Sequence, residues 1–113
     1  MSGISTHVLD NSRGRPGSGV AVTLEFRTAT GWEVRGGGTT DDDGRIGRLL
    51  SEEEELVRGI YRVTFDAGSY YRLKGQECFY PQVVIVFEVT RADEHYHIPL
   101  LLNAFGYTTY RGN

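Results

Sequence analysis

Most of the chain consists of short segments in which apolar and polar residues alternate, each bounded by glycine or another turn residue. Apolar residues occupy every second position of 20–27, and the segment 61–66 alternates in the same way. Because successive side chains of a strand point to opposite faces, both segments are typical of strands with one covered face. The segment 83–89 is apolar on both faces apart from Glu88, which predicts a central strand covered on both sides.

Glycine marks the turns between these segments. It supplies 15 of the 113 residues, well above its usual share of about 7%. A short strand around Trp32 and Val34 is expected to end at the glycines 36–38, and Asp43-Gly44 is a strong turn signal. The pattern contains roughly seven or eight short strands. It predicts an all-β sandwich, formed by a single domain that covers residues 1–113.

Two segments have helical features. The segment 66–73 begins with an aspartate that can cap a helix, and Gly75 behind it is a typical stop signal. The segment 51–54 has the serine and glutamate of a capping box, but barely one apolar turn follows before Gly59. We therefore predict one short helix at 66–73 and a solvated acidic turn at 51–54.

Charge and cysteine content exclude several classes of protein. The chain has 12 Lys and Arg residues against 15 Asp and Glu, a formal net charge of −3, whereas binding nucleic acid requires clustered positive charge. No apolar run approaches the roughly 18 residues of a membrane span, and residues 1–10 lack the basic start and apolar core of a signal peptide. With one cysteine, Cys78, no disulfide forms within the chain. We expect a cytoplasmic protein with no nucleic-acid and no membrane partner.

The three histidines, His7, His95 and His97, are the first candidates for chemistry. If 95–102 is a strand, its tyrosine, isoleucine and alternate leucines share one face and both histidines lie on the other. The same alternation in 4–9 turns His7 away from the core. All three imidazoles are therefore expected on outer faces of the sandwich.

Three interpretations of these histidines are open. They can be solvated surface residues, which is what spacing alone favours. A His-x-His strand with a third, distant histidine can also hold zinc and leave one coordination position open. The third interpretation is metal-free acid–base catalysis, for which histidine suits neutral pH because its unperturbed pKa is about 6.5.

Two further features carry candidate chemistry. Arg45 and Arg48 flank the turn at Asp43-Gly44. Each is either a solvated turn cation or an anchor whose guanidinium holds a carbonyl or anionic group. The segment 107–113 contains two tyrosines and an arginine. Tyrosine is ordered at little entropic cost and is favoured at interfaces, so this segment predicts a docked tail.

Seven short runs stand in order along the whole chain: THVLD at 6–10, RGRP at 13–16, DGR at 43–45, GIY at 59–61, FYP at 79–81, HYHIPLLL at 95–102 and YRG at 110–112. Together they resemble the 5-hydroxyisourate hydrolases, the transthyretin-like enzymes of urate breakdown. The resemblance implies a transthyretin-type β-sandwich of two four-stranded sheets with one short helix. It also implies a homotetramer, a dimer of dimers, with active sites in a channel between the two dimers.

Transthyretin has the same fold but carries thyroid hormone, so the fold does not decide the function. Transthyretins lack the N-terminal histidine, the turn arginine, the second histidine of the His-x-His strand and the Tyr-Arg-Gly ending of the hydrolases. This sequence keeps His7, Arg45, His97 and the run 110–112, which favours the enzyme. A small-molecule carrier that binds an aromatic ligand in the channel, and a surface module that recognises a protein partner, are the alternatives.

The resemblance also implies a reaction and a set of roles. Water opens the six-membered ring of 5-hydroxyisourate at an amide-type carbonyl, giving 2-oxo-4-hydroxy-4-carboxy-5-ureidoimidazoline, with no metal and no other cofactor. His7 and His97 are expected to activate water and transfer protons, while Arg45 stabilises the developing charge. Residues that bind substrate are then expected to be His7, Arg45, Tyr110, Arg111, Gly112 and Asn113.

Asn113 departs from the family pattern, and His95 has no clear part in it. The family usually ends in serine after Tyr-Arg-Gly, and this sequence has Asn113 there. The amide can take over a positioning role of the hydroxyl but not a role in proton transfer. His95 shares a face with His97, and the family pattern gives it no clear catalytic part, so we expect it to be supporting or structural.

Overall fold

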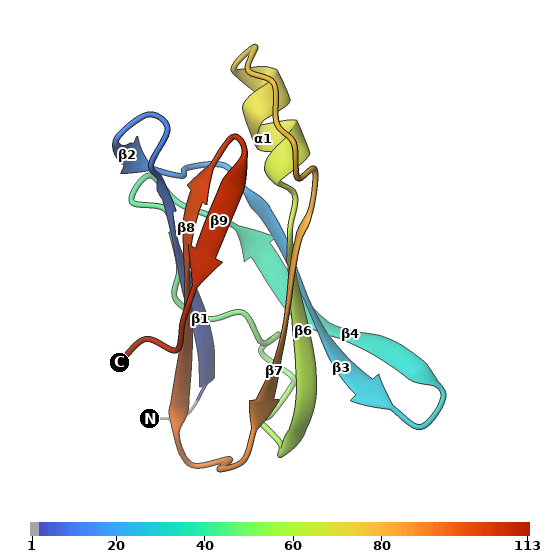
Figure 1. The fold of residues 1–113 in the computed structure, drawn as a ribbon. Coiled ribbons are helices and arrows are strands. Elements are labelled where there is room, and N and C mark those ends of the chain that lie inside the picture. The colour runs from blue at the N-terminus through green and yellow to red at the C-terminus, as the bar shows by residue number, and fades with distance from the viewer. Residues whose placement is uncertain (1–2) are drawn as a thin grey trace.

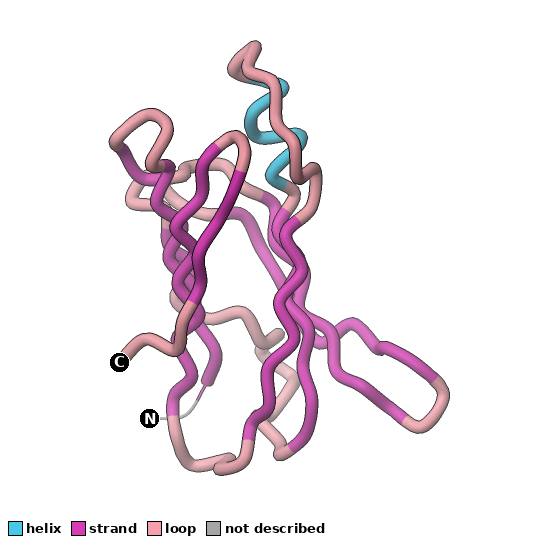
Figure 2. Tube along the Cα trace, viewed as in Figure 1, coloured by secondary structure: helices cyan, strands magenta, loops and turns pink. Residues whose placement is uncertain are grey.

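A computed structural model describes residues 3–113, so the first two residues of the expected domain lie outside the described range. Within 3–113, nine strands and one helix form a sandwich of two sheets (Figure 1). In chain order the elements are β1 (Gly3–Asp10), β2 (Arg15–Pro16), β3 (Ala21–Thr28), β4 (Gly31–Thr39), β5 (Arg45–Ile46), β6 (Gly59–Phe65), α1 (Ala67–Leu73), β7 (Val83–Val89), β8 (His95–Asn103) and β9 (Gly106–Thr109). Figure 2 shows that strands account for most of the trace and that the short helix stands at one end.

The two sheets have different numbers of strands. One has the order β4-β3-β6-β7, and the other has the order β2-β1-β8-β9 with β5 also paired to β1. The sandwich and its single short helix agree with the fold expected from the resemblance. The second sheet counts five strands where four were expected, because β2 and β5 are two-residue segments that both pair with β1, near Leu9 and His7 respectively.

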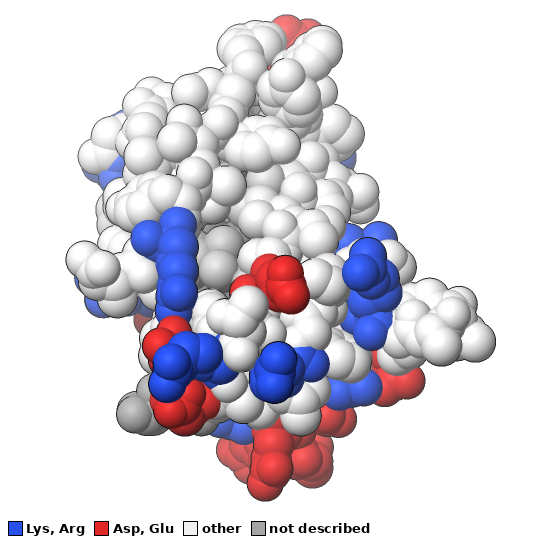
Figure 3. Space-filling model, turned by 60° about the horizontal axis from the view of Figure 1, so that its bottom comes forward, with Lys and Arg blue, Asp and Glu red and all other residues white. Residues whose placement is uncertain are grey.

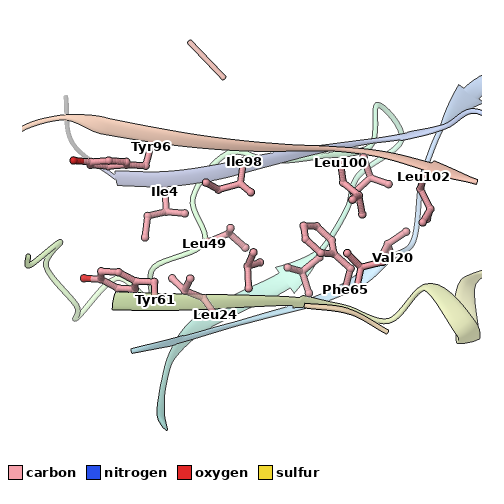
Figure 4. Packing of buried hydrophobic residues seen from close by; sticks show 14 of the residues in the cluster. Ile4, Val20, Leu24, Leu49, Tyr61, Phe65, Tyr96, Ile98, Leu100 and Leu102 are labelled. Atoms are coloured by element: carbon pink, nitrogen blue, oxygen red, sulfur yellow. The ribbon is translucent and has the colours of Figure 1, made fainter. Parts of the chain in front are cut away.

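The core fills the space between the sheets. On β8, Tyr96, Ile98 and Leu100 are at most 5% exposed, and Figure 4 shows them facing Leu24 and Phe65 of the opposite sheet. This is the inward face that the alternation of 95–102 predicts. Burying each such side chain contributes about 1.5–3 kcal/mol, so the inner face fixes which side chains of β8 point outward.

The prediction of a central strand at 83–89 is wrong. Within residues 3–113, β7 pairs with β6 alone and forms the edge of its sheet. Val84 and Val86 lie on its outer face and are 44% and 56% exposed. A strand that is apolar on both sides has two faces suited to burial, but the pattern does not say whether this chain itself covers both.

The glycines at 36–38 continue β4 instead of ending it. A Cβ atom on Gly36 would lie 1.8 Å from the carbonyl oxygen of Leu49, because the segment before Ser51 crosses the strand at this point. Gly36 forms a bridge with Leu50 there. Gly36 therefore marks a close approach of two backbone segments. In the sequence alone, a glycine that permits such an approach looks the same as a glycine that marks a turn.

The helix and the acidic turn occur where they were predicted. Asp66 caps α1 by accepting a hydrogen bond from the backbone N–H of Ser69 at 3.1 Å, and Gly75 beyond its end has φ 68°. At 51–54 the chain forms a turn, with Glu54 N–H donating to the carbonyl of Ser51. Over the part of the chain that is described, no helix has the length and hydropathy needed to cross a membrane.

Candidate active site

The candidate site is built on the outer face of β1 and β8, which run parallel to each other. Their register places Ser5 beside His97 and His7 beside Pro99. The neighbours Thr6 and Val8 are buried, whereas His7 and His97 are partly exposed. The expectation that the histidines lie on the outer face is confirmed, because the two-residue period of each strand commits the intervening side chains to the core.

A tight turn brings Arg45 to this face. The carboxylate of Asp41 accepts hydrogen bonds from the backbone N–H groups of Asp43 and Arg45, each at 2.9 Å, and Gly44 has the left-handed φ of 79° that the turn requires. β5 follows at once and pairs with β1 so that Arg45 lies opposite His7.

The same turn engages His7. Its Nε2 lies 2.9 Å from the carbonyl oxygen of Asp43. A carbonyl oxygen only accepts, so Nε2 carries a proton and donates it to this hydrogen bond. The neutral His7 imidazole therefore keeps its lone pair on Nδ1.

Ser5 connects the two histidines of β8. Its Oγ lies 2.8 Å from Nε2 of His95 and 2.8 Å from Nδ1 of His97, and the residue is 8% exposed. Sequence reasoning did not single out Ser5. The sequence contained the information, because Ser5 lies two positions before His7 on a predicted strand and must therefore share its face.

The tail packs against His97. Gly112 N–H donates to the carbonyl oxygen of His97 at 2.9 Å. A Cβ atom at position 112 would lie 2.6 Å from Cδ2 of the His97 ring, so only glycine fits without a shift. The predicted docking of the tail is confirmed at this contact.

A hollow of about 290 Å³ lies among these groups. Its lining residues come from β1, β5, β8 and the tail, and they are Ser5, Thr6, Arg45, Ile46, Gly47, His95, His97 and Asn113. The hollow thus joins Arg45, His97 and Asn113, with His7 next to Arg45 on the neighbouring strand. Its size lies just below the usual range of about 300–1,000 Å³ for small-molecule sites.

The electrostatics of the hollow act on His97. Burial lowers the pKa of His97 below the ordinary histidine value, and electrostatic interactions with His7, His95 and Arg45 lower it further. The imidazole is therefore neutral at pH 7 and able to accept a proton. Within residues 3–113, no three His, Cys, Asp or Glu side chains gather as ligands for a metal ion.

Two tail residues line a different hollow. Tyr110 and Arg111 border a space of about 310 Å³ between β7 and β8 that also contains Phe87 and Tyr96. The Arg111 guanidinium stacks 4.3 Å from the centre of the Tyr96 ring and pairs with Glu94 at 3.1 Å. The structure therefore brings Gly112 and Asn113 to the histidines, but it does not bring the Arg111 side chain there.

Charged side chains gather at the end of the sandwich that Figure 3 brings forward, where β7 turns into β8. Both signs are interleaved on this face. Glu94 pairs there with Arg91 at 3.3 Å as well as with Arg111. These exposed pairs position the tail and contribute little to stability individually.

A model of the HIUase/Transthyretin family matches residues 4–112. The chain belongs to this family. It is 43% identical over 110 residues to the 5-hydroxyisourate hydrolase of Salmonella typhimurium, a match that covers 97% of this chain and 80% of that protein.

Solved structures of the family superpose closely on this chain. The structure of Klebsiella pneumoniae 5-hydroxyisourate hydrolase has a TM-score of 0.85 at 34% identity and covers 99% of this chain and 100% of that one. The crystal structure of transthyretin from Sparus aurata has a TM-score of 0.89 at 32% identity, with 99% and 97% covered. The relatives in sequence are named as hydrolases, and this member of the family is an enzyme, a hydrolase.

Proposed function

We propose that this hydrolase opens the ring of 5-hydroxyisourate by adding water to an amide-type carbonyl. The observation that carries the proposal is one outer sheet face on which His7 lies opposite Arg45 while His97 and Asn113 line the adjoining hollow. The relatives that bear the name of this activity support the same substrate.

His97 is the base of the proposed reaction. Its Nδ1 is hydrogen-bonded to Ser5, so Nε2 is the nitrogen free to act on water. As His97 takes a proton from water, the water oxygen bonds to the carbonyl carbon and the carbonyl electron pair moves onto oxygen. Arg45 stabilises this oxyanion, because its guanidinium is always charged and offers paired donors.

The oxyanion then collapses. The carbon–nitrogen bond breaks, its electron pair moves to nitrogen, and nitrogen takes up the proton that water lost. His97 returns this proton in the proposed scheme. His7 orients the substrate and shares in proton transfer through Nδ1, because its Nε2 is held by the carbonyl oxygen of Asp43.

The tail completes the proposed site. Asn113 lines the hollow and offers an amide that can hold a polar edge of the substrate. Gly112 sets the position of Asn113 through its contact with His97. Arg111 contributes by fixing the tail against Tyr96 and Glu94, and a direct contact of Tyr110 or Arg111 with substrate stays a prediction.

Assembly is part of the proposal. A hollow on an outer sheet face is open to solvent until another copy covers it, and a symmetric interface repeats the covered site across its axis. We infer a homotetramer, a dimer of dimers, in which residues 1–113 act as one transthyretin-like hydrolase domain. Covering the hollow excludes water and strengthens the interactions of Arg45 with developing charge.

The test follows the absorbance decay of freshly made 5-hydroxyisourate with and without the protein. The compound decays slowly unaided, so the expected result is acceleration. His7→Ala, Arg45→Ala and His97→Ala should each lower kcat by about 10²–10³-fold, with fold and assembly retained. Arg27→Ala, which removes an exposed arginine from β3, is the matched control and should leave turnover unchanged.

Each outcome has a consequence. Wild-type turnover in one of the three variants would remove that residue from the mechanism, and no acceleration by the wild type would overturn the proposed function. Activity should survive exhaustive chelation. A loss restored by zinc would favour a metal site at the histidines instead.

The alternative function is a carrier of the transthyretin type. The close superposition on Sparus aurata transthyretin favours it, since the same fold supports both roles. A carrier would bind an aromatic ligand saturably and would not accelerate the decay of 5-hydroxyisourate.

A further inference from the structure

Ser5 lies between two imidazoles. The roles proposed for His7, Arg45 and His97 do not explain why a serine stands at this position. Its Oγ is 2.8 Å from Nδ1 of His97 and 2.8 Å from Nε2 of His95. The hydroxyl is held on β1 beside His97 by the strand register and is almost buried, with 8% of the residue exposed.

A hydroxyl has one proton, so it donates to one histidine and accepts from the other. In one arrangement, His97 Nδ1–H donates to Ser5 and Ser5 donates to His95, which leaves Nε2 of His97 unprotonated. In the reverse arrangement, His95 Nε2–H donates to Ser5, Ser5 donates to His97 Nδ1, and Nε2 of His97 carries the proton. The first arrangement gives a base and the second gives an acid at the same atom.

We propose that Ser5 is a positioning residue that sets the tautomer of His97 and relays protons between His97 and His95. The inference rests on the proposed hydrolysis, in which His97 both removes a proton from water and returns one to nitrogen. Ser5 does not touch substrate in this scheme and acts through His97.

The relay balances without another reactant. After Nε2 of His97 takes a proton from water, the Nδ1 proton passes to Ser5 Oγ and the hydroxyl proton passes to Nε2 of His95. One N–H and one O–H bond break, one O–H and one N–H bond form, and the positive charge moves to His95. When His97 gives its Nε2 proton to the departing nitrogen, both transfers reverse and the first arrangement returns.

The surroundings favour moving the charge in this direction. The charged or titratable groups that face His97 are His7 on β1, Arg45 on β5 and His95 on β8, and His97 is partly buried among them. His95 is exposed, so water solvates a charge better there than at His97. The tail contributes Gly112 and Asn113 at this point, and the Arg111 charge is paired with Glu94.

The first measurement needs no substrate. Nitrogen chemical shifts of the His97 imidazole report which ring nitrogen carries the proton. In the wild type near neutral pH we expect the proton on Nδ1, and in Ser5→Ala a shift towards the Nε2–H form. Ser5→Thr, which keeps the hydroxyl, should restore the wild-type pattern, and Ser51→Ala, which removes the hydroxyl that donates to the Arg35 carbonyl, should not alter it.

The second measurement is kinetic. Ser5→Ala should lower kcat about a hundredfold with little change in KM and should change the pH profile of kcat, while Ser5→Thr recovers most of the rate. His95→Phe removes the far end of the relay and should lower kcat in the same direction even if Ser5→Ala does not fold. An unchanged His97 tautomer in Ser5→Ala, or unchanged kcat and pH profile in both variants, would overturn the relay. Failure of the wild type to hydrolyse the substrate would instead count against the proposed function, because the tautomer measurement is independent of turnover.

Discussion

Two polar clusters are organised by β1, and they differ in how completely their side chains are buried and paired. At the end of the strand, Asp10 is fully buried and accepts hydrogen bonds from the hydroxyls of Tyr70 at 2.7 Å and Tyr71 at 2.8 Å. In the middle of the strand, Ser5 and His7 face the outer surface, where the histidines of the candidate site are partly exposed. The first cluster is closed and the second is open.

The closed cluster joins α1 to the sandwich. Burial raises the pKa of both tyrosine hydroxyls, and the hydrogen bond to Asp10 contributes to the rise in each, so both stay protonated and donate at any physiological pH. Ser12 N–H also donates to Asp10 at 3.0 Å. With its oxygens occupied and no access to water, this carboxylate serves stability.

The open cluster has the opposite properties. Ser5 bonds to two imidazoles whose tautomers are exchangeable, and His97 keeps one ring nitrogen for the hollow. The same strand therefore supplies both a structural polar group and polar groups of the proposed active site. Burial and the completeness of hydrogen bonding, and not residue type, separate the two.

The largest expected effect comes from opening the closed cluster. Asp10→Ala leaves two buried hydroxyls without their acceptor, which should lower the free energy of unfolding by roughly 2–6 kcal/mol, or about 1–3 for each hydroxyl. Urea denaturation measures the loss. The folded fraction should keep its activity per molecule, because the candidate site lies at His7 on β1 and at His95 and His97 on β8, away from Asp10.

Asp93→Ala is the matched control for this variant. Asp93 is 75% exposed and lies 3.6 Å from Arg91, so its removal should change the free energy of unfolding by less than about 0.5 kcal/mol. Equal denaturation midpoints for Asp10→Ala and the wild type would contradict the structural role of the closed cluster.

An intermediate effect is expected from disturbing the open cluster without removing a polar group. In Gly112→Ala the new Cβ would lie 2.6 Å from the His97 ring, so the ring or the tail must move. We expect kcat/KM to fall about 10- to 100-fold, with little change in the denaturation midpoint because the tail is exposed. Gly106→Ala, whose Cβ would make an ordinary 3.7 Å contact with Asn103, should behave as the wild type. Equal kcat/KM values for the two variants would show that the tail does not position His97.

The alternation in the sequence was sufficient to predict the inner faces of the strands, and the capping aspartate and the stop signal at Gly75 were sufficient to predict the helix at 66–73. It failed at β7, because the residues 83–89 are apolar on both sides and the pattern contains no information on which layer covers an outer face. It also failed at β4, where Gly36 permits a backbone contact with Leu49. Contacts between segments distant in sequence leave no periodic signal.

The candidate site was likewise predictable from the sequence only in part. The positions of His7, His95 and His97 in the alternating pattern predicted that their side chains point outward, because this depends on local strand geometry alone. The parallel register that sets Ser5 beside His97 depends on how two distant strands pair, so the bridge between the imidazoles could not be derived. The stacking of Arg111 on Tyr96 depends on the path of the tail across the sheet, which the sequence pattern does not give, and contact of Arg111 with substrate stays a prediction.

The smallest expected effect concerns the protonation of His97, which is partly buried whereas Asp10 of the closed cluster is fully buried. The proposed base, His97, must be neutral to accept a proton, and its lowered pKa keeps it neutral at lower pH than an ordinary histidine. The acid limb of kcat/KM should therefore have its midpoint below about 6.5, the ordinary histidine value. Because burial is the largest cause of the shift and nearby charges are secondary, about 1 M salt, which shortens the Debye length to about 3 Å, should move the midpoint only slightly upward. A midpoint at or above the ordinary value would contradict a half-buried His97 base, and a large salt-induced rise would mean that His7, His95 and Arg45 control it instead of burial.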